Sequence, residues 1–217
     1  MANEYILETH QLTKRFGGVH AVEDVDFRLR QGELRCVIGP NGAGKSTFFK
    51  MLTAQLKPST GHITFDGQDI SGLQRHAVSR MGIGIKNQVP DVFDGISTRE
   101  NLWAAARFRH DAQHAEPIID KVLSQMNLAG VADNLVGELS HGQRQWVEFG
   151  MVMSLEPKII LLDEPTAGMT VEETNLTADL ILEINKTTPI VVVEHDMQFI
   201  RKIADIVTVL HQGKVLA

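Results

Sequence analysis

The sequence predicts an α/β fold: a mostly parallel sheet flanked by helices, with a small antiparallel β region near the N-terminus and a helical segment inserted in the core. Short runs rich in β-branched residues alternate with helical patterns, as a parallel sheet with crossover helices requires. Four of these runs are almost continuously apolar, which fits strands buried on both faces. Between about residues 90 and 156 the pattern changes to helical periodicity with no strong strand.

The first strands expected lie at residues 5–9 and 25–29, and a third lies at 62–65, before the turn dipeptide Asp66-Gly67. Runs of this length next to such a turn are typical of antiparallel pairing. They form the predicted N-terminal β region.

The parallel sheet is expected from the apolar runs at residues 34–38, 159–163, 190–194 and 206–210. A helix is expected at 47–55, soon after the first of these runs. Further helices are expected at 98–108, 117–126 and 143–155. We therefore expect a single domain over residues 1–217, with a core of about 1–89 and 157–217 and a helical subdomain of about 90–156.

The chain has 217 residues and a mass of 24.0 kDa, enough for one sizeable core. It has no apolar run near the about 20 residues that a membrane span needs, and residues 1–4 lack the basic and apolar parts of a secretion signal. We therefore expect a soluble, cytoplasmic chain. A formal net charge of −6 without a basic cluster argues against nucleic-acid binding, because phosphate contacts need a clustered basic face.

A complete phosphate-binding loop of the form GxxxxGK[ST] follows the first apolar run. It consists of Gly39, Pro40, Asn41, Gly42, Ala43, Gly44, Lys45, Ser46 and Thr47. The glycines let the backbone turn its N–H groups inward, and the following helix directs its positive dipole end at the phosphates. Lys45 can reach the β- and γ-phosphates, and Ser46 can supply a hydroxyl to Mg²⁺. A glycine-rich turn with a chance lysine is the alternative, but the order of strand, loop and helix favours a nucleoside triphosphate site.

A second motif narrows the class, since motors, kinases, GTPases and transport ATPases all share such a loop. The segment Leu139-Ser140-His141-Gly142-Gln143 lies ahead of an apolar run that ends in Asp163-Glu164. With the phosphate loop, Gln88 and His195 in family order as well, the chain resembles the ABC ATPase family over essentially its whole length. The resemblance implies a P-loop NTPase (RecA-like) core with an inserted helical subdomain, and it implies ATP and Mg²⁺ as cofactors.

Two adjacent carboxylates suit ATP hydrolysis, which needs a metal to neutralise charge and a group to orient or deprotonate the attacking water. Asp163 is the candidate metal ligand, directly or through water, together with Ser46. Glu164 is the candidate general base. In the alternative interpretation, the two carboxylates only cap the next segment.

The resemblance assigns roles to three further residues. His195 would contact the γ-phosphate and hold Glu164 in place, whereas a lone histidine at a strand end is otherwise often a turn residue. Gln88 would bind Mg²⁺ and water through its carbonyl oxygen and join the core to the helical subdomain; the alternative is a surface glutamine before a proline turn. Phe16 would stack on adenine with little base discrimination; the alternative is a core phenylalanine.

Ser140 and Gly142 precede a helix expected near Gln143, and a helix N-terminus suits anions. Because the chain already has a phosphate loop, the resemblance implies that Ser140, Gly142 and Gln143 bind the γ-phosphate held by a second ATPase subunit, identical or related. ATP would then join two cassettes, and hydrolysis would separate them. Two positions depart from the family pattern: His141 replaces a common glycine, and Thr170 replaces an aspartate.

Residues 139–146, 165–170 and 195–197 resemble the importers of branched-chain amino acids and urea, closest to the ATP-binding subunits of urea permeases. This implies transmembrane permease subunits as partners, a periplasmic solute-binding protein as an indirect partner, and a place on the inner face of the cell membrane. The permease contact is expected beside Gln88, where Val89, Val92 and Phe93 offer apolar surface. Two other classes stay open: a soluble ABC ATPase of DNA repair or translation, and a module that binds ATP only to dimerise.

Overall fold

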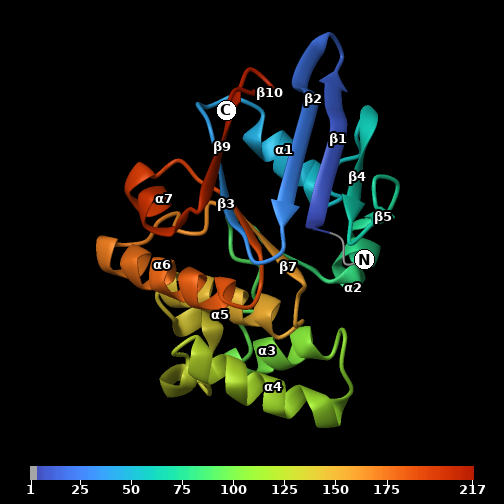
Figure 1. The fold of residues 1–217 in the computed structure, drawn as a ribbon. Helices are drawn as coiled ribbons and strands as arrows, with labels where there is room; N and C mark the ends of the chain where they lie inside the picture. The colour runs from blue at the N-terminus through green and yellow to red at the C-terminus, as the bar shows by residue number, and fades with distance from the viewer. Residues whose placement is uncertain (1–3) are drawn as a thin grey trace.

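Two β-sheets organise the chain, whose computed structural model describes residues 4–217. Residues 1–3, part of the segment inspected for a secretion signal, lie outside the described residues. The larger sheet has the strand order β10-β9-β3-β8-β7-β6, and the smaller has the order β2-β1-β4-β5. Figure 1 shows the two sheets in the upper part of the molecule and the helices α3, α4 and α5 below them. The predicted α/β class is confirmed.

The larger sheet is parallel from β9 to β6, and β10 pairs antiparallel with β9. Its strands are β3 (Leu34–Ile38), β6 (Ile83–Lys86), β7 (Ile159–Asp163), β8 (Ile190–Val193), β9 (Ile206–His211) and β10 (Lys214–Val215). All four residues of β8 are buried, as are the first four of β7, which explains their unbroken apolar sequence. The four predicted apolar strands are therefore correct to within one residue, but β6 and β10 were missed.

The smaller sheet is antiparallel, as predicted, but its first two strands are longer than predicted. They are β1 (Tyr5–Phe16) and β2 (Val19–Arg30), and the sheet is completed by β4 (Thr60–Phe65) and β5 (Gln68–Asp69). Several register shifts interrupt the β1–β2 ladder. Gln11 and Asp24, which lie within these shifts, have positive φ. Such irregularities break the alternating pattern that would reveal a long strand from sequence.

Helix α1 (Lys45–Leu52) lies between the two sheets (Figure 1). Its buried Phe48 and Phe49 belong to a core cluster that includes residues of both sheets, such as Leu7 and Val191. A second buried cluster lies on the other face of the large sheet and includes Phe149 and Phe199. Each face of the large sheet therefore has its own apolar core, as a doubly covered parallel sheet requires.

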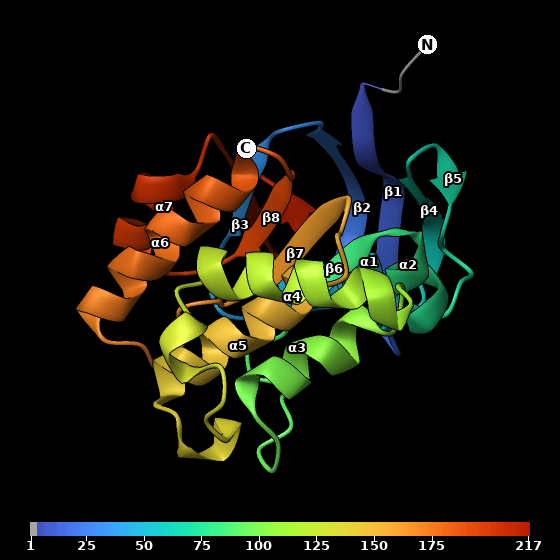
Figure 2. The same cartoon turned by 90° about the horizontal axis from the view of Figure 1, so that it is seen from below.

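Between β6 and β7 the chain forms α3 (Thr98–Ala106), α4 (Ala112–Gln125), two short 3₁₀ turns and α5 (His141–Met153). Figure 2, seen from below, shows these helices side by side in front of the sheet. Helix α4 begins five residues before the predicted start at Pro117, because the side chain of Asp111 caps it by accepting from the amide of His114. Helix α5 begins two residues before the predicted start at Gln143. The division into a core and a helical subdomain stays a prediction.

Three helices were not predicted: α2 (Arg75–Met81), α6 (Val171–Asn185) and α7 (Met197–Ile203). For α6 the signal was present in the sequence, because Thr170 and Glu173 form a reciprocal capping box at its N-terminus.

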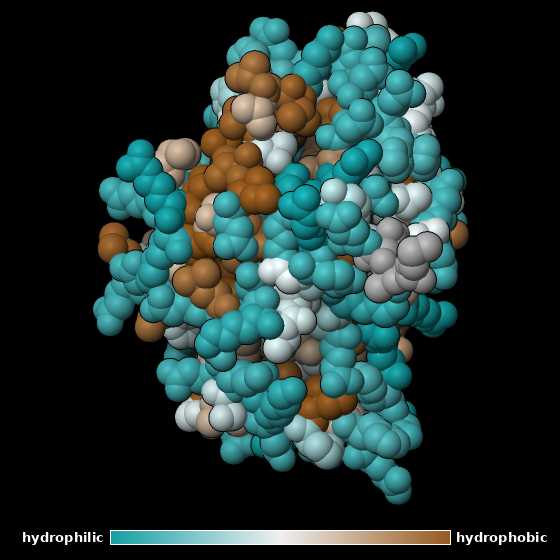
Figure 3. All heavy atoms as spheres, viewed as in Figure 1, coloured by the Kyte–Doolittle hydropathy of each residue, from teal (hydrophilic) through white to brown (hydrophobic). Residues whose placement is uncertain are grey.

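Within residues 4–217, no helix combines the length and the apolar character that crossing a membrane requires. Figure 3 shows apolar side chains gathered over β9 and β10, where Ile206, Val207, Val215 and Leu216 are exposed.

Candidate nucleotide site

The candidate site lies where the carboxyl ends of the parallel strands meet, the usual place for ligands in such sheets. The phosphate loop leaves β3, Asp163 ends β7, His195 lies two residues after β8, and Gln88 lies two residues after β6. A cavity of about 330 Å³ lies at the loop, lined by residues 41–47 together with Ala21 and Glu164. Segments far apart in the sequence therefore converge on one cavity.

The phosphate loop depends on glycine at two positions for a reason visible in the structure. Gly44, the N-cap of α1, has φ of 101°, and a Cβ added there would lie 2.3 Å from the carbonyl oxygen of Ala21. A Cβ on Gly39 would lie 2.2 Å from the carbonyl oxygen of Leu210. Among residues 4–217, no side chain caps the N-terminus of α1. The first-turn amides of α1 are therefore directed at the cavity without a side-chain partner, which suits an anion.

Lys45 is the first residue of α1 and is buried. Its ammonium group donates to the carbonyl oxygens of Gly39, at 2.7 Å, and Pro40, at 3.2 Å. These contacts fold the side chain back over the loop, so that its positive charge lies where phosphates would be cradled. The neighbouring Ser46 is exposed.

Glu164 brings together two of the residues predicted from family order. Gln88 Nε2 donates to Glu164 Oε2 at 2.7 Å, and His195 Nδ1 lies 3.5 Å from Glu164 Oε1. The amide of Glu164 donates to the carbonyl oxygen of Val193, and its φ of 44° turns the chain sharply out of β7. The candidate base is thus held between the ends of three different strands, at the rim of the phosphate-loop cavity.

Asp163 is half-buried beside Glu164. Burial and the nearby charges of Glu164 and Glu194 raise the pKa of the Asp163 carboxyl, while Lys50 and Lys45 oppose this increase. An excess of negative charge at this point fits a divalent cation. Within residues 4–217, no group of three or more His, Cys, Asp or Glu side chains is arranged to hold a metal ion. Mg²⁺ commonly takes one or two carboxylates and completes its coordination with phosphate oxygens and water, so the Asp163 carboxylate suits such a site.

The buried carboxylate of Glu194 is a positioning group, although its sequence position predicts only a strand end. Its Oε1 accepts from the Thr166 hydroxyl at 2.6 Å, and its Oε2 accepts from the amides of His195, at 2.7 Å, and Asp196, at 3.3 Å. The same Oε2 lies 3.5 Å from His195 Nδ1. Glu194 therefore ties the segment after β7 to the turn that carries His195.

Replacing Glu194 by leucine is expected to lower the free energy of unfolding by about 1–3 kcal/mol, because two part-buried N–H groups and a buried hydroxyl lose their acceptor. Glu194→Gln is the matched control. Its amide oxygen can still accept from the two N–H groups, and its NH₂ can donate to the Thr166 hydroxyl. Chemical denaturation measures both variants. Equal stability of the leucine and glutamine variants would contradict the assignment.

The Ser140 motif is built as a capping box at the start of α5. The Ser140 hydroxyl accepts from the amide of Gln143 at 3.2 Å, and Gln143 Oε1 accepts from the amide of Ser140 at 3.0 Å. The box uses one acceptor site of each side chain and none of their donors. The hydroxyl proton of Ser140 and the NH₂ group of Gln143 thus stay available to donate to an anion.

Gly142 lies against the carboxylate of Glu173. A Cβ at Gly142 would lie 2.1 Å from Glu173 Oε1, so a larger residue there would require the Glu173 side chain to move. Glu173 is held by the amide and hydroxyl of Thr170, and Thr170 is the N-cap of α6. The departure at Thr170 is therefore compatible with the fold, since threonine and aspartate both cap helices.

His141, the other departure, points across to the segment after β7. Its Nε2 lies 3.1 Å from the carbonyl oxygen of Ala167. Because a carbonyl can only accept, the imidazole donates from Nε2 in this contact. The larger side chain thus stays within its own chain.

Not every candidate residue reaches the phosphate-loop cavity. In the described part of the chain, Gln88, Asp163 and His195 adjoin Glu164 at its rim without lining it, and Ser140, Gly142, Gln143 and Phe16 do not line it either. Phe16 lies at the tip of the β1–β2 hairpin, where half of its surface is exposed and the Lys14 ammonium lies 5.4 Å from its ring centre. The core alternative for Phe16 is therefore wrong, whereas its stacking on adenine stays a prediction. The separation of the Ser140 motif from the loop of the same chain fits its use by another subunit.

Comparison with known proteins agrees with this geometry. A sequence profile described as ABC transporter matches residues 22–167. The high-affinity branched-chain amino acid transport ATP-binding protein BraF of Pseudomonas aeruginosa is 35% identical, over 98% of this chain and 90% of that one. The lipopolysaccharide export system ATP-binding protein LptB of Haemophilus influenzae is 31% identical, over 98% of this chain and 89% of that one. The fold also matches the crystal structure of the ADP conformation of MJ1267, an ATP-binding cassette of an ABC transporter. The TM-score is 0.88 and the sequence identity 27%, over 99% of this chain and 91% of that one.

Proposed function

Because the chain belongs to the ABC transporter family as an ATP-hydrolysing subunit, we propose that it powers the import of a small polar solute, urea or a branched-chain amino acid. The observation that carries the catalytic part is the contact of Gln88 and His195 with Glu164 beside the phosphate loop. The BraF relative, named for branched-chain amino acid transport, supports the importer branch. The resemblance to urea permease subunits supports urea as the other candidate solute.

In the proposed mechanism, the phosphate loop binds the triphosphate through its backbone amides and Lys45. Glu164 accepts a proton from the attacking water or orients that water. His195 contacts the γ-phosphate and fixes Glu164, and Gln88 holds the other carboxylate oxygen of Glu164. Bound Mg²⁺ would neutralise charge on the phosphates, and Ser46, Asp163 and Gln88 are the residues that would hold it.

Two copies, or this chain and a related ATPase subunit, complete each other's sites in the proposed cycle. Ser140 and Gln143 have donors available, and they donate to the γ-phosphate held by the facing subunit together with the amide of Gly142. ATP thus favours the closed pair because it binds both subunits at once, and hydrolysis removes that advantage. The pair works on the inner face of the cell membrane, bound to transmembrane permease subunits that a periplasmic binding protein supplies with solute.

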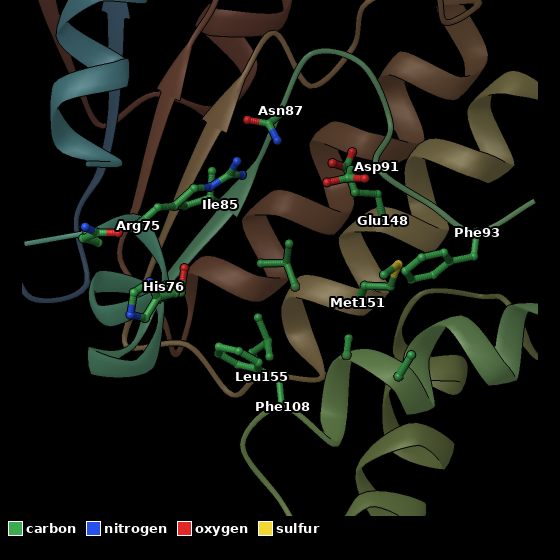
Figure 4. A pocket seen from close by; sticks show the side chains of 15 residues that line it. Arg75, His76, Ile85, Asn87, Asp91, Phe93, Phe108, Glu148, Met151 and Leu155 are labelled. Carbon is green, nitrogen blue, oxygen red and sulfur yellow. The ribbon is translucent and has the colours of Figure 1, made fainter. Parts of the chain in front are cut away.

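The proposed permease contact is a groove of about 630 Å³ between α2, α3, α5 and the segment after β6. Figure 4 shows Phe93 next to Met151, and Leu155 next to Phe108, so apolar side chains line much of it. Arg75 and His76 lie on another wall. We propose that a short cytoplasmic segment of the permease docks here and that the helical subdomain, residues 90–156, moves with it against the core of residues 1–89 and 157–217.

Of the three residues first expected at this contact, Phe93 alone lines the groove. Phe93 is 59% exposed, and Val89 is 75% exposed but lies outside the groove lining. Val92 is partly buried and packs against the core, so its place in the contact stays a prediction. Phe93 is therefore the residue on which to test docking.

Phe93→Ala is expected to leave the ATPase activity of the isolated chain near normal and to abolish most solute transport, because it removes an exposed ring from the permease contact and no group from the nucleotide site. ATP-dependent uptake into proteoliposomes that contain the permease and binding protein measures this. Leu182→Ala, at an exposed leucine of α6 outside the groove, is the control. Unchanged uptake by the Phe93 variant would contradict the docking proposal.

The same proteoliposomes test which solute is transported. We expect ATP-dependent uptake of labelled urea or of labelled leucine, with the second solute as the internal comparison. Uptake of neither, in vesicles where ATP is hydrolysed, would contradict the importer assignment. It would favour an export role such as the one named for LptB.

A further inference from the structure

A buried ammonium group lies two residues before Gln88, at the end of β6. Lys86 is fully buried, although nearly all lysines in folded proteins keep their charge in water. Its neighbours in β6 are apolar or glycine, and it ends the strand that leads to Gln88. A charge in this position has no part in the mechanism described above.

The Lys86 ammonium lies close to three acceptor oxygens and donates hydrogen bonds to two of them. The group lies 3.1 Å from the carbonyl oxygen of Asn87, 3.1 Å from Glu148 Oε2, and in hydrogen-bond contact with Gln145 Oε1. Gln145 and Glu148 lie on α5, one turn apart from each other and just after the Ser140 motif. The cluster therefore joins the strand end that carries Gln88 to the helix that carries Ser140.

The ammonium group also fixes the orientation of the Gln145 side chain. Ammonium has no acceptor, so only the amide oxygen of Gln145 can face it, and the NH₂ group must point away. That NH₂ group lies 3.3 Å from the backbone oxygen of Gln88 and 3.4 Å from His141 Nε2. Because His141 donates from Nε2 to Ala167, the NH₂ group of Gln145 has the backbone of Gln88 as its acceptor.

Glu148 balances the charge of the cluster. Burial lowers the pKa of Lys86 and raises that of Glu148, while the attraction between the two charges opposes both shifts. The backbone amides of Asp91 and Asn87 also favour the charged carboxylate. A buried ion pair of this kind is often no more stabilising than an apolar pair of the same size. Stability alone therefore gives little reason for a lysine at this position.

We propose that Lys86 is a positioning residue for ATP hydrolysis: through Gln145 it holds the backbone of Gln88, and thereby the contact of the Gln88 side chain with Glu164. The orientation of one amide links the buried cation to the candidate base. The inference rests on the proposed roles of Gln88 and Glu164.

The test uses a pair replacement, because Lys86→Met alone leaves the Glu148 charge buried without a partner and can unfold the chain. In Lys86→Met/Glu148→Leu both charges are replaced by side chains of similar size. We expect a thermal midpoint at or above that of the unaltered chain. We expect kcat for ATP to fall roughly 10- to 100-fold, the range for loss of a group that orients a catalytic one, with KM within about twofold.

Gln145→Met provides the second arm, since it removes the amide and leaves both charges. It is expected to lower kcat by a similar factor, and adding it to the pair replacement should cause no further loss, because both changes remove the same hold on Gln88. Hydrogen exchange of residues 87–93 in nucleotide-free protein should speed up in both variants. Lys158→Met, at an exposed lysine just before β7, is the matched control and should leave both measurements unchanged.

The outcomes distinguish failure of the Lys86 positioning role from failure of the proposed ATPase function. Folded variants with unchanged kcat and unchanged exchange at residues 87–93 would overturn the positioning role and leave the ATPase assignment intact. Additive losses from the pair replacement and Gln145→Met would also overturn it, because the two would then act independently. Failure of the unaltered chain to hydrolyse ATP would instead contradict the proposed function.

Discussion

Glu164→Gln is expected to lower ATP turnover about 10²- to 10⁴-fold, the usual contribution of a general base, while ATP binding stays near that of the unaltered chain. The substitution removes the basic oxygen, but an amide oxygen can still accept from Gln88 Nε2, so the local geometry is retained. The phosphate loop and Lys45 are not changed. Steady-state phosphate release and equilibrium binding of ATP measure the two effects separately.

The control for this change is Glu156→Gln, at an exposed glutamate that pairs with His110 away from the loop. It should keep full turnover. If Glu164→Gln also retained full turnover, Glu164 would not be the base. The capping alternative for the Asp163-Glu164 pair would then be the better interpretation.

Gly44→Ala is expected to destabilise the chain and to abolish most ATP binding. Its φ of 101° is a conformation that residues with a Cβ adopt at a cost of about 1–3 kcal/mol. The added Cβ would also meet the backbone oxygen of Ala21, which cannot move without β2. At about 2–4 °C per kcal/mol for a chain of this size, the strain alone lowers the thermal midpoint by roughly 2–12 °C. Nucleotide binding should fall as well, because the shift displaces the first-turn amides of α1.

Substitutions at two other glycines separate the effect of backbone strain from the effect of the steric clash. Gly42→Ala shares the positive φ but meets no atom within 4 Å, so it should show the strain cost without the clash. Gly95→Ala has neither feature and should be neutral or slightly stabilising. The expected order of stability is Gly95→Ala, then Gly42→Ala, then Gly44→Ala. A Gly44 variant as stable as the Gly42 variant would contradict the close approach of β2 to the loop.

The elements that could be predicted from sequence are those whose environment leaves a simple pattern. Strand β8 is buried on both faces, so its four residues are all apolar and its position was predictable to one residue. Strand β6 is buried except at the half-buried Ile85, but Gly84 and Lys86 interrupt its apolar pattern. The buried charge at Lys86 is offset by Glu148 and Gln145, which lie about 60 positions further along the chain. Local patterns carry no information about such partners, so this strand was missed.

The candidate site likewise has parts that a local sequence motif reveals and parts that depend on contacts between distant segments. The phosphate loop and the Asp163-Glu164 pair are local motifs, and the sequence alone indicated their chemistry. The hold of Gln145 on Gln88 and of Glu194 on the His195 turn arises from contacts between distant segments. Gln145 is a buried polar residue among the mostly apolar buried residues of α5. Its place in that helix was a signal that could have marked it as a candidate.

The central claim is that two subunits close over shared ATP through the Ser140 motif. Sedimentation of the Glu164→Gln variant with Mg-ATP tests it most directly, alone and mixed with any related ATPase subunit encoded beside it, with Ser140→Arg added in a second sample to block the closure. We expect the 24.0 kDa chain to sediment as a pair when Mg-ATP is present, and as single chains without nucleotide or with the Ser140 change. A strictly monomeric Glu164→Gln variant at high concentration in Mg-ATP, even with the related subunit, would contradict the claim.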